Sequence, residues 1–313
     1  MLIYLLFVVG LIILVYGGDW LVKGAVGLAE HLTISPLIIG LTIVAFGTSA
    51  PELVISLKSA LTGNPGVAVG NIVGSNIANV LLVLGVPAMI ATIYCSSEDL
   101  KFTLYLLLAT TALFCLELVM APIGRLGGLL LLVCLTVFLS TQYITARRQN
   151  QDPDYMDDVG ELPKSLGITI ALLVVGLIAL PLGASMAVNA AVDIARVWNV
   201  SDEVIGLTIV AIGTSLPELA TGIMAARQGN ASVGIGNVVG SNFFNIAAIM
   251  GITAVVAGDV PVGDNIVPFD MTVMAISTIF LAVVTLAGFA INRLLGAVLL
   301  VLYAAYLVAT AML

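Results

Sequence analysis

The hexapeptide GTSAPE at residues 47–52 places two hydroxyls, a proline and a carboxylate inside a long apolar segment. A nearly identical hexapeptide, GTSLPE, follows 166 residues later at residues 213–218. The same offset aligns residues 40–85 with residues 206–251 without a gap, and about half of the aligned positions are identical. The sequence therefore predicts two copies of one structural unit.

The composition is that of an integral membrane protein, because 61% of the 313 residues are hydrophobic and only 9% are charged. A spanning helix needs roughly 20 apolar residues, and the apolar runs between short polar breaks predict about ten such helices. These runs are continuous and do not alternate, which excludes a transmembrane β-barrel. The predicted fold class is therefore an all-α integral membrane protein.

A long polar stretch, residues 146–164, divides the chain into residues 1–145 and residues 165–313. Each part is predicted to contain five helices and one copy of the signature. Because five is odd, the second copy must cross the membrane in the opposite sense, which makes the pair an inverted repeat. The polar stretch also carries much of the net charge of −8, and we interpret it as a solvated linker loop.

The basic residues predict how the chain is oriented, since cytoplasmic loops are enriched in lysine and arginine. Placing the linker in the cytoplasm puts most of them inside, namely Lys101, Arg147, Arg148, Lys164, Arg227 and Arg293, against Arg125 and Arg196 outside. Both termini are then external. We expect a multi-pass protein of the cell inner (plasma) membrane.

Each signature is predicted to break its helix. Pro51 has no backbone N–H and its ring clashes with the carbonyl four residues earlier, and Pro217 repeats this in the second copy. The break exposes carbonyl oxygens, which hydrocarbon does not tolerate unless another group, such as a cation, satisfies them. Thr48 and Glu52 are four residues apart and share one helical face, with Ser49 beside them.

A second pair of polar elements lies at residues 70–79 and 236–245. Asn, Ser and Asn recur there at spacings of four and form one polar stripe in each copy, namely Asn71, Ser75 and Asn79, and Asn237, Ser241 and Asn245. Glycines four residues apart in the same elements allow close helix approach. Two stripes facing two broken helices predict a cage of oxygen atoms near the membrane midplane.

The predicted cage contains neither histidine nor cysteine, so it favours hard cations such as Na⁺, Ca²⁺, Mg²⁺ or Mn²⁺. Flexible amide and carbonyl ligands suit Ca²⁺ better than Mg²⁺. Two carboxylates, Glu52 and Glu218, offset the charge of one Ca²⁺, and several Na⁺ ions satisfy the same cage. Mutually exclusive occupancy is what an antiporter requires. Helix packing or a structural acid pair would explain one signature alone, but two in register favour a transport site.

At these residues the chain resembles the sodium/calcium exchanger family of cation/calcium antiporters, in particular its prokaryotic members. The resemblance covers residues 40–85 and 206–251 and implies one central site at which Ca²⁺ and Na⁺ compete. It also implies that the first and sixth helices slide across the core to alternate access. The metal ligands it implies are Thr48, Ser49, Glu52, Ser75, Asn79, Thr214, Ser215, Glu218 and Ser241, with the backbone carbonyls of Ala45 and Ala211.

One candidate ligand departs from part of the family, because Asn245 stands where some members carry aspartate. That difference leaves ion stoichiometry and dependence on K⁺ open. The elements at residues 70–79 and 236–245 also lack the acid that follows Gly-Asn in the proton/calcium branch, which favours Na⁺ as the driving ion.

The predicted function is a secondary active Na⁺/Ca²⁺ antiporter that exports Ca²⁺ in exchange for Na⁺ by alternating access. The alternatives are a proton-coupled or K⁺-dependent exchanger and a passive cation channel. An enzyme is not expected, because no Ser/His, paired Asp or His/Glu arrangement occurs in a span. The expected partners are Ca²⁺, Na⁺ and the lipid bilayer, with no cofactor, nucleic acid or protein partner.

Overall fold

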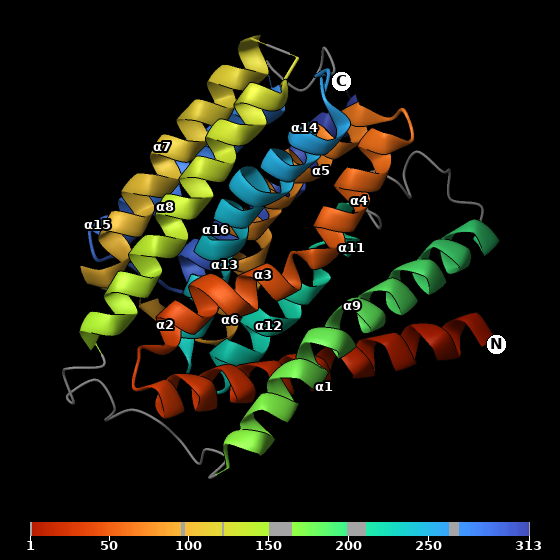
Figure 1. Cartoon of the computed structure of the whole chain (residues 1–313). Helices are drawn as coiled ribbons and strands as arrows, with labels where there is room; N and C mark the ends of the chain where they lie inside the picture. Colours follow the sequence, from red (N-terminus) through yellow and green to blue (C-terminus); the bar gives the residue numbers. More distant parts are fainter. Residues whose placement is uncertain are drawn as a thin grey trace.

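The computed structural model describes residues 2–94, 98–120, 122–149, 165–198, 211–262 and 269–312. Most of these residues are helical (Figure 1). The elements before the linker are α1 (Leu2–Leu32), α2 (Pro36–Ile39), η1 (Gly40–Val44), α3 (Ala45–Thr48), α4 (Ala50–Leu61), α5 (Pro65–Ala78), η2 (Asn79–Val83), α6 (Gly85–Ile90), β1 (Ile93–Tyr94), α7 (Glu98–Met120) and α8 (Arg125–Gln149). Most of the predicted linker, residues 146–164, lies outside the described ranges.

The second part of the chain repeats this order of elements. It contains α9 (Leu166–Val197), α11 (Ala211–Gly213), α12 (Leu216–Arg227), α13 (Ala231–Phe243), η5 (Phe244–Met250), α14 (Gly251–Ala257), α15 (Met271–Leu286), β2 (Ala290–Ile291) and α16 (Arg293–Met312). Both parts therefore open on a long helix, continue through short broken helices and end on two plain helices.

The described helices confirm a multi-pass membrane protein. Seven are long and apolar enough to span a bilayer, and an eighth span is the bent pair Pro36–Thr48 and Ala50–Leu61. Of the other two predicted spans, α15 has 16 residues, which is shorter than the roughly 20 that a perpendicular crossing needs. The other predicted span contains the second signature, and only the end of this span, α11 and α12, falls within the described residues.

The predicted helix breaks are both present at the signatures. The first axis bends by 43° between α3 and α4. Ser49 leaves the helical region there with φ −85° and ψ 3°, and Ser215 does the same between α11 and α12 with φ −88° and ψ 7°. Each proline then lies in the first turn of the next helix, where its missing N–H is tolerated.

Within the described ranges, three π-helical segments, which the sequence did not predict, adjoin the signature elements. They are η1, immediately before α3, η2, which begins at Asn79, and η5, which contains Asn245. π-helical turns are rare and occur frequently at functional sites, because they disturb the regular i to i+4 bonding of the backbone. Each segment therefore changes the direction of side chains next to the signatures.

α1 and α9 cross on one flank of the bundle, opposite α7 and α8 (Figure 1). A Cβ placed on Gly10 would lie 2.7 Å from the backbone nitrogen of Ala187, and one on Gly176 would lie 2.6 Å from that of Leu21. These two contacts are related by the offset of 166 residues. Glycine thus lets the two backbones touch, as in other close-packed membrane helices.

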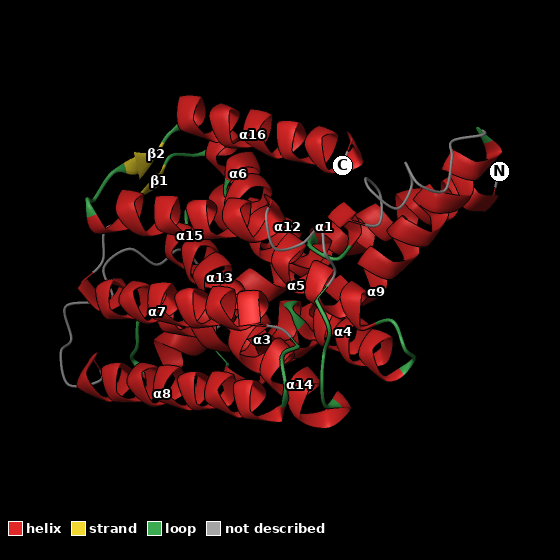
Figure 2. Cartoon of the chain, turned by 90° about the horizontal axis from the view of Figure 1, so that it is seen from above, coloured by secondary structure: helices red, strands yellow, loops and turns green. Residues whose placement is uncertain are grey.

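The apolar core consists of two clusters. The larger one joins α5, α7, α8, α13 and α15 and includes the stacked rings of Phe138 and Phe243, whose centroids are 4.3 Å apart. The smaller one is built mainly from α1, α9 and part of α12. Figure 2 shows α1 and α9 leaving the rest of the bundle together at one side. The α1–α9 pair is thus a separate packing unit beside the core.

Two short antiparallel pairings tie loops together at the ends of α7. Before α7, β1 pairs with β2, with Ile93 opposite Ile291. After α7, Ile123 forms an isolated bridge with Val260. The loops that flank α7 are therefore joined to different loops of the second part of the chain.

Candidate functional site

The candidate site lies where the breaks of two helices meet the π-helical segments of two others. The α3–α4 break contacts α12 and α13, α4 contacts η5, and α12 contacts η2. Ten of the twelve residues predicted from sequence are at most 3% exposed, namely Ala45, Thr48, Ser49, Glu52, Ser75, Asn79, Ser215, Glu218, Ser241 and Asn245. Burying so many polar side chains in an apolar bundle is unfavourable unless they have partners.

Hydrogen bonds join the two repeats directly at this site. Ser49 Oγ donates to Glu218 Oε1 at 3.2 Å. Thr48 Oγ1 lies 3.0 Å from Asn237 Oδ1 and 3.5 Å from Ser241 Oγ. The first signature and both elements of the second repeat therefore surround one small volume.

The two carboxylates are near enough to interact electrostatically. Glu52 and Glu218 each lie in the first turn of a helix, α4 and α12, where the positive end of the helix dipole partly offsets a negative charge. Within the described ranges, neither carboxylate has an ion pair with lysine, arginine or histidine. Two anions buried at 1% exposure without a basic partner require a cation or a proton.

Many buried polar atoms of the site have no hydrogen-bond partner among the described residues. They are Oε2 of Glu52, Oε2 of Glu218, Oγ of Ser75, Oγ of Ser215, and both side-chain amide atoms of Asn79 and of Asn245. An unsatisfied buried group costs roughly 1–3 kcal/mol, and more when it is charged. The oxygens among these atoms match the ligands of a hard cation such as Ca²⁺ or Na⁺.

The described residues hold no group of three or more His, Cys, Asp and Glu side chains that could bind a metal ion. The site is therefore built from two carboxylates together with neutral hydroxyl and amide groups. This composition disfavours Zn²⁺ and Cu⁺, which prefer nitrogen and sulfur ligands, and it matches the total charge of one divalent cation.

Thr214 is the predicted ligand whose position differs most from that of its repeat equivalent, Thr48. It is only half-buried and lines a cavity of about 480 Å³ between α4 and α9. Ser185, Asn189 and Val54 line the same cavity. The structure thus places Thr48 inside the hydrogen-bonded cluster and Thr214 where the cavity reaches the second signature.

Comparison with known proteins agrees with this geometry. A family model described as "Sodium/calcium exchanger protein" matches residues 2–144 and 168–312. The chain belongs to the sodium/calcium exchanger family. A relative from Alkalimonas amylolytica, "Putative antiporter CaxA", is 39% identical over an alignment of 313 positions that covers 98% of each chain. "Sodium/calcium exchanger MaX1" from Methanosarcina acetivorans is 34% identical over an alignment of 341 positions that covers 97% of each chain.

A solved structure gives the same relationship in three dimensions. The sodium-calcium exchanger NCX_Mj, soaked with zero Na⁺ and Ca²⁺, superimposes with a TM-score of 0.83 at 30% sequence identity. The match covers 99% of both chains. The family resemblance read from the two signatures is therefore confirmed over nearly the whole chain.

The two predicted carbonyl ligands differ in what the structure describes of them. In this exchanger the carbonyl of Ala45 accepts a hydrogen bond from the backbone nitrogen of Ser49 at 3.0 Å and lies 3.3 Å from Thr48 Oγ1. Rotation of the Thr48 hydroxyl toward Asn237 frees one side of that oxygen. Ala211 begins α11, immediately after residues outside the described ranges.

Sequence reasoning put Asn71 and Asn237 on the polar stripes but assigned them no partner. Asn237 reaches Thr48 because α13 packs tightly on α2, with a Cβ on Gly236 placed 2.7 Å from the carbonyl oxygen of Leu37. Asn71 instead donates to Ser56 Oγ at 2.9 Å and joins α5 to α4. Ser56 corresponds to glycine in the second repeat, which is the only sequence signal for the difference.

Proposed function

We propose that this protein is a secondary active antiporter that exports Ca²⁺ in exchange for Na⁺. The observation that carries the proposal is the buried cluster of two carboxylates and unpaired hydroxyl and amide oxygens shared by the two signatures. The names of its relatives MaX1 and NCX_Mj, both sodium/calcium exchangers, support the same ion pair. Na⁺, Ca²⁺ and the lipid bilayer are the only partners this requires.

The proposed ligands are the side chains predicted from the sequence and the carbonyls of Ala45 and Ala211. Ca²⁺ neutralises Glu52 and Glu218 together, whereas Na⁺ ions must occupy several positions to do the same. The two cations therefore compete for the same carboxylates, and each expels the other. When the cage is loaded it is neutral, and the protein can change between its inward-facing and outward-facing conformations. When the cage is empty it keeps two buried charges, and the protein does not change conformation.

The proposed architecture is ten spans in two inverted repeats, residues 1–145 and 165–313, joined by the linker at residues 146–164. The loop pairings support this inversion. Tyr94 and Val260 are equivalent by the offset of 166, yet Tyr94 lies in β1, before α7, and Val260 is bridged to Ile123, after α7. Equivalent loops at opposite ends of one spanning helix are what an inverted repeat produces.

The proposed orientation places the linker in the cytoplasm and both termini outside the inner (plasma) membrane, as the basic residues predict. α4 and α9 then both run toward the outside, and the cavity between them provides external access to Thr214 and the second signature. The equivalent space between α12 and α1 is packed. The described conformation is accordingly assigned as outward-open.

The test is uptake of radioactive Ca²⁺ into proteoliposomes loaded with Na⁺ and diluted into Na⁺-free buffer. Uptake that requires internal Na⁺ and disappears in Glu52→Gln and Glu218→Gln variants is the expected result. Parallel vesicles carry a pH gradient, added K⁺, or no counter-ion. Uptake driven by protons, uptake that needs K⁺, or Ca²⁺ conductance without counter-ion would each replace Na⁺/Ca²⁺ exchange by one of the alternative functions.

A further inference from the structure

We propose that Asp19 of α1 is a gating residue, which holds the path between α1 and α12 closed through a hydrogen bond with Gln228. This inference deepens the proposed antiport function, since it assigns the groups that set the balance between the two access states. It concerns a contact outside the ion cage, between the α1–α9 pair and the end of a signature helix.

The closed path is sealed by direct packing of α1 on α12. A Cβ placed on Gly18 would lie 3.0 Å from the carbonyl oxygen of Ala220, so little space separates the helices. Asp19 Oδ1 accepts a hydrogen bond from Gln228 Nε2 at 2.9 Å, and Asp19 Oδ2 pairs with Lys23 Nζ, also at 2.9 Å. Asp19 thereby links α1 to Gln228, the residue that follows the end of α12.

The residues equivalent by the 166-residue offset line the open cavity on the other side of the site. Ala220 corresponds to Val54, and Asp19 corresponds to Ser185; both counterparts face the cavity between α4 and α9. Gln228 corresponds to Thr62, whose hydroxyl donates within its own helix to the carbonyl of Lys58 at 2.9 Å. One structure therefore contains the same interface in a closed form and an open form.

The two interfaces differ in chemistry as well as in shape. A carboxylate and an amide close the α1–α12 interface, whereas a serine and a threonine occupy the equivalent positions at the α4–α9 interface. A hydrogen bond to an ionised acceptor is stronger than one between neutral groups. The state in which α1 is closed on α12 consequently has a stabilising contact that the opposite state lacks.

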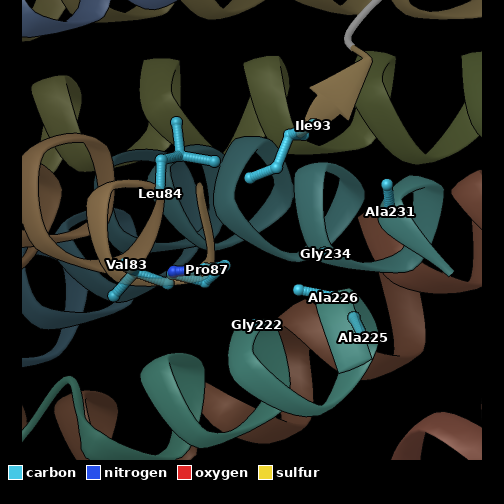
Figure 3. A pocket seen from close by; sticks show the side chains of 9 residues that line it. All are labelled: Val83, Leu84, Pro87, Ile93, Gly222, Ala225, Ala226, Ala231 and Gly234. Atoms are coloured by element: carbon cyan, nitrogen blue, oxygen red, sulfur yellow. The ribbon is translucent and has the colours of Figure 1, made fainter. Parts of the chain in front are cut away.

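α12 is held against the core, so opening of the interface is assigned to movement of α1. Figure 3 shows the contact of α12 with η2 and α6, where Gly222 faces Val83 and Pro87. A Cβ on Gly222 would lie 3.1 Å from the Pro87 ring and 3.3 Å from the Val83 carbonyl oxygen, and the residual space of about 10 Å³ is mostly apolar. α1 packs mainly on α9, in the smaller apolar cluster, to which α12 contributes a minor part.

The repeat itself supplies a matched experiment. Val54→Cys reports on the open interface and Ala220→Cys on the closed one, in a background in which Cys95, Cys115 and Cys134 are replaced by serine. Each reporter is labelled with a polar maleimide in detergent, where both faces of the protein meet the reagent. The unmodified exchanger is expected to label quickly at position 54 and slowly at position 220.

Loss of the gate contact is expected to change the two reporters in opposite directions. Asp19→Ala or Gln228→Ala should raise the labelling rate at position 220 about tenfold and lower it at position 54, a population shift of about 1.4 kcal/mol. The double variant should add little to either single change, because both remove one contact. The counterparts Ser185→Ala and Thr62→Ala should leave both rates within a factor of two.

Two results would overturn the assignment. One is unchanged labelling in both Asp19→Ala and Gln228→Ala; the other is a parallel rise at both positions, which indicates loosening of the fold. The same contact can also be introduced at the open interface, by combining Ser185→Asp with Thr62→Gln. This double variant should slow labelling at position 54. Labelling needs no ion gradient, so it tests the gate independently of transport. If the labelling rates at positions 54 and 220 change in opposite directions but Na⁺ drives no Ca²⁺ uptake, the antiport function is refuted and the gating role of Asp19 stands.

Discussion

Replacing Glu52 by glutamine removes one of two charges from the buried site while it keeps the shape of the side chain. Both carboxylates are 1% exposed, so solvent screens their attraction for a bound cation very little. Breaking a buried charge pair costs about 3–5 kcal/mol, against 0–1 kcal/mol for a surface pair. We therefore expect Glu52→Gln to weaken Ca²⁺ binding by roughly two to four orders of magnitude.

Equilibrium binding of radioactive Ca²⁺ to the purified protein measures this loss without requiring transport. Glu117→Gln is the matched control, because Glu117 likewise has buried carboxylate oxygens without a hydrogen-bond partner among the described residues, but it lies on α7 against Gly127 of α8. The control should change Ca²⁺ affinity less than twofold. An affinity within tenfold of the unmodified protein in Glu52→Gln would show that Glu52 is not a ligand and would refute the charge argument.

Two further pairs of substitutions test the packing of α9 on α1 and the hydrogen bond between α5 and α4. Gly176→Ala places a methyl group 2.6 Å from the backbone of Leu21 and should destabilise the protein by about 1–3 kcal/mol. Gly66→Ala is the control, because a methyl group there meets no atom within 4 Å and should not destabilise the protein. Thermal unfolding in detergent compares the two variants. Asn71→Ala and Ser56→Ala should each cost about 1 kcal/mol and add to less than their sum, since they share one hydrogen bond; additive losses would contradict that pairing.

The sequence predicted the features that depend on local chemistry. Proline inside an apolar run predicts a broken helix, and both breaks occur, at Ser49 and at Ser215. The ion pair between Asp19 and Lys23, at 2.9 Å, is equally local, because residues four apart on a helix lie side by side.

The features that depend on tertiary packing were not predictable in the same way. The two signature hexapeptides differ at one position, yet Thr48 is enclosed and Thr214 lines a cavity. Neither signature alone distinguishes Thr48 from Thr214. The difference arises because α1 is packed on α12, whereas a cavity separates α9 from α4. The π-helical turns at η1, η2 and η5 likewise have no residue signal, because they depend on how neighbouring helices pack.

The span count shows the same division between local and tertiary information. A run of apolar residues predicts that a helix crosses the membrane, but α15 has only 16 helical residues. It is followed by a turn in which Gly288 has a positive φ, and hydropathy does not reveal that turn.

The glycine contacts between α1 and α9 bear on leakage through the protein. Helices that touch through Gly10 and Gly176 have no room to shift independently, so α1 and α9 move as one body, and withdrawal of one from its signature helix brings the other closer to its own. A continuous pore would need both helices to withdraw at once. A helix crossing that lies outside the proposed ion cage thus limits the leakage of Na⁺ through the protein.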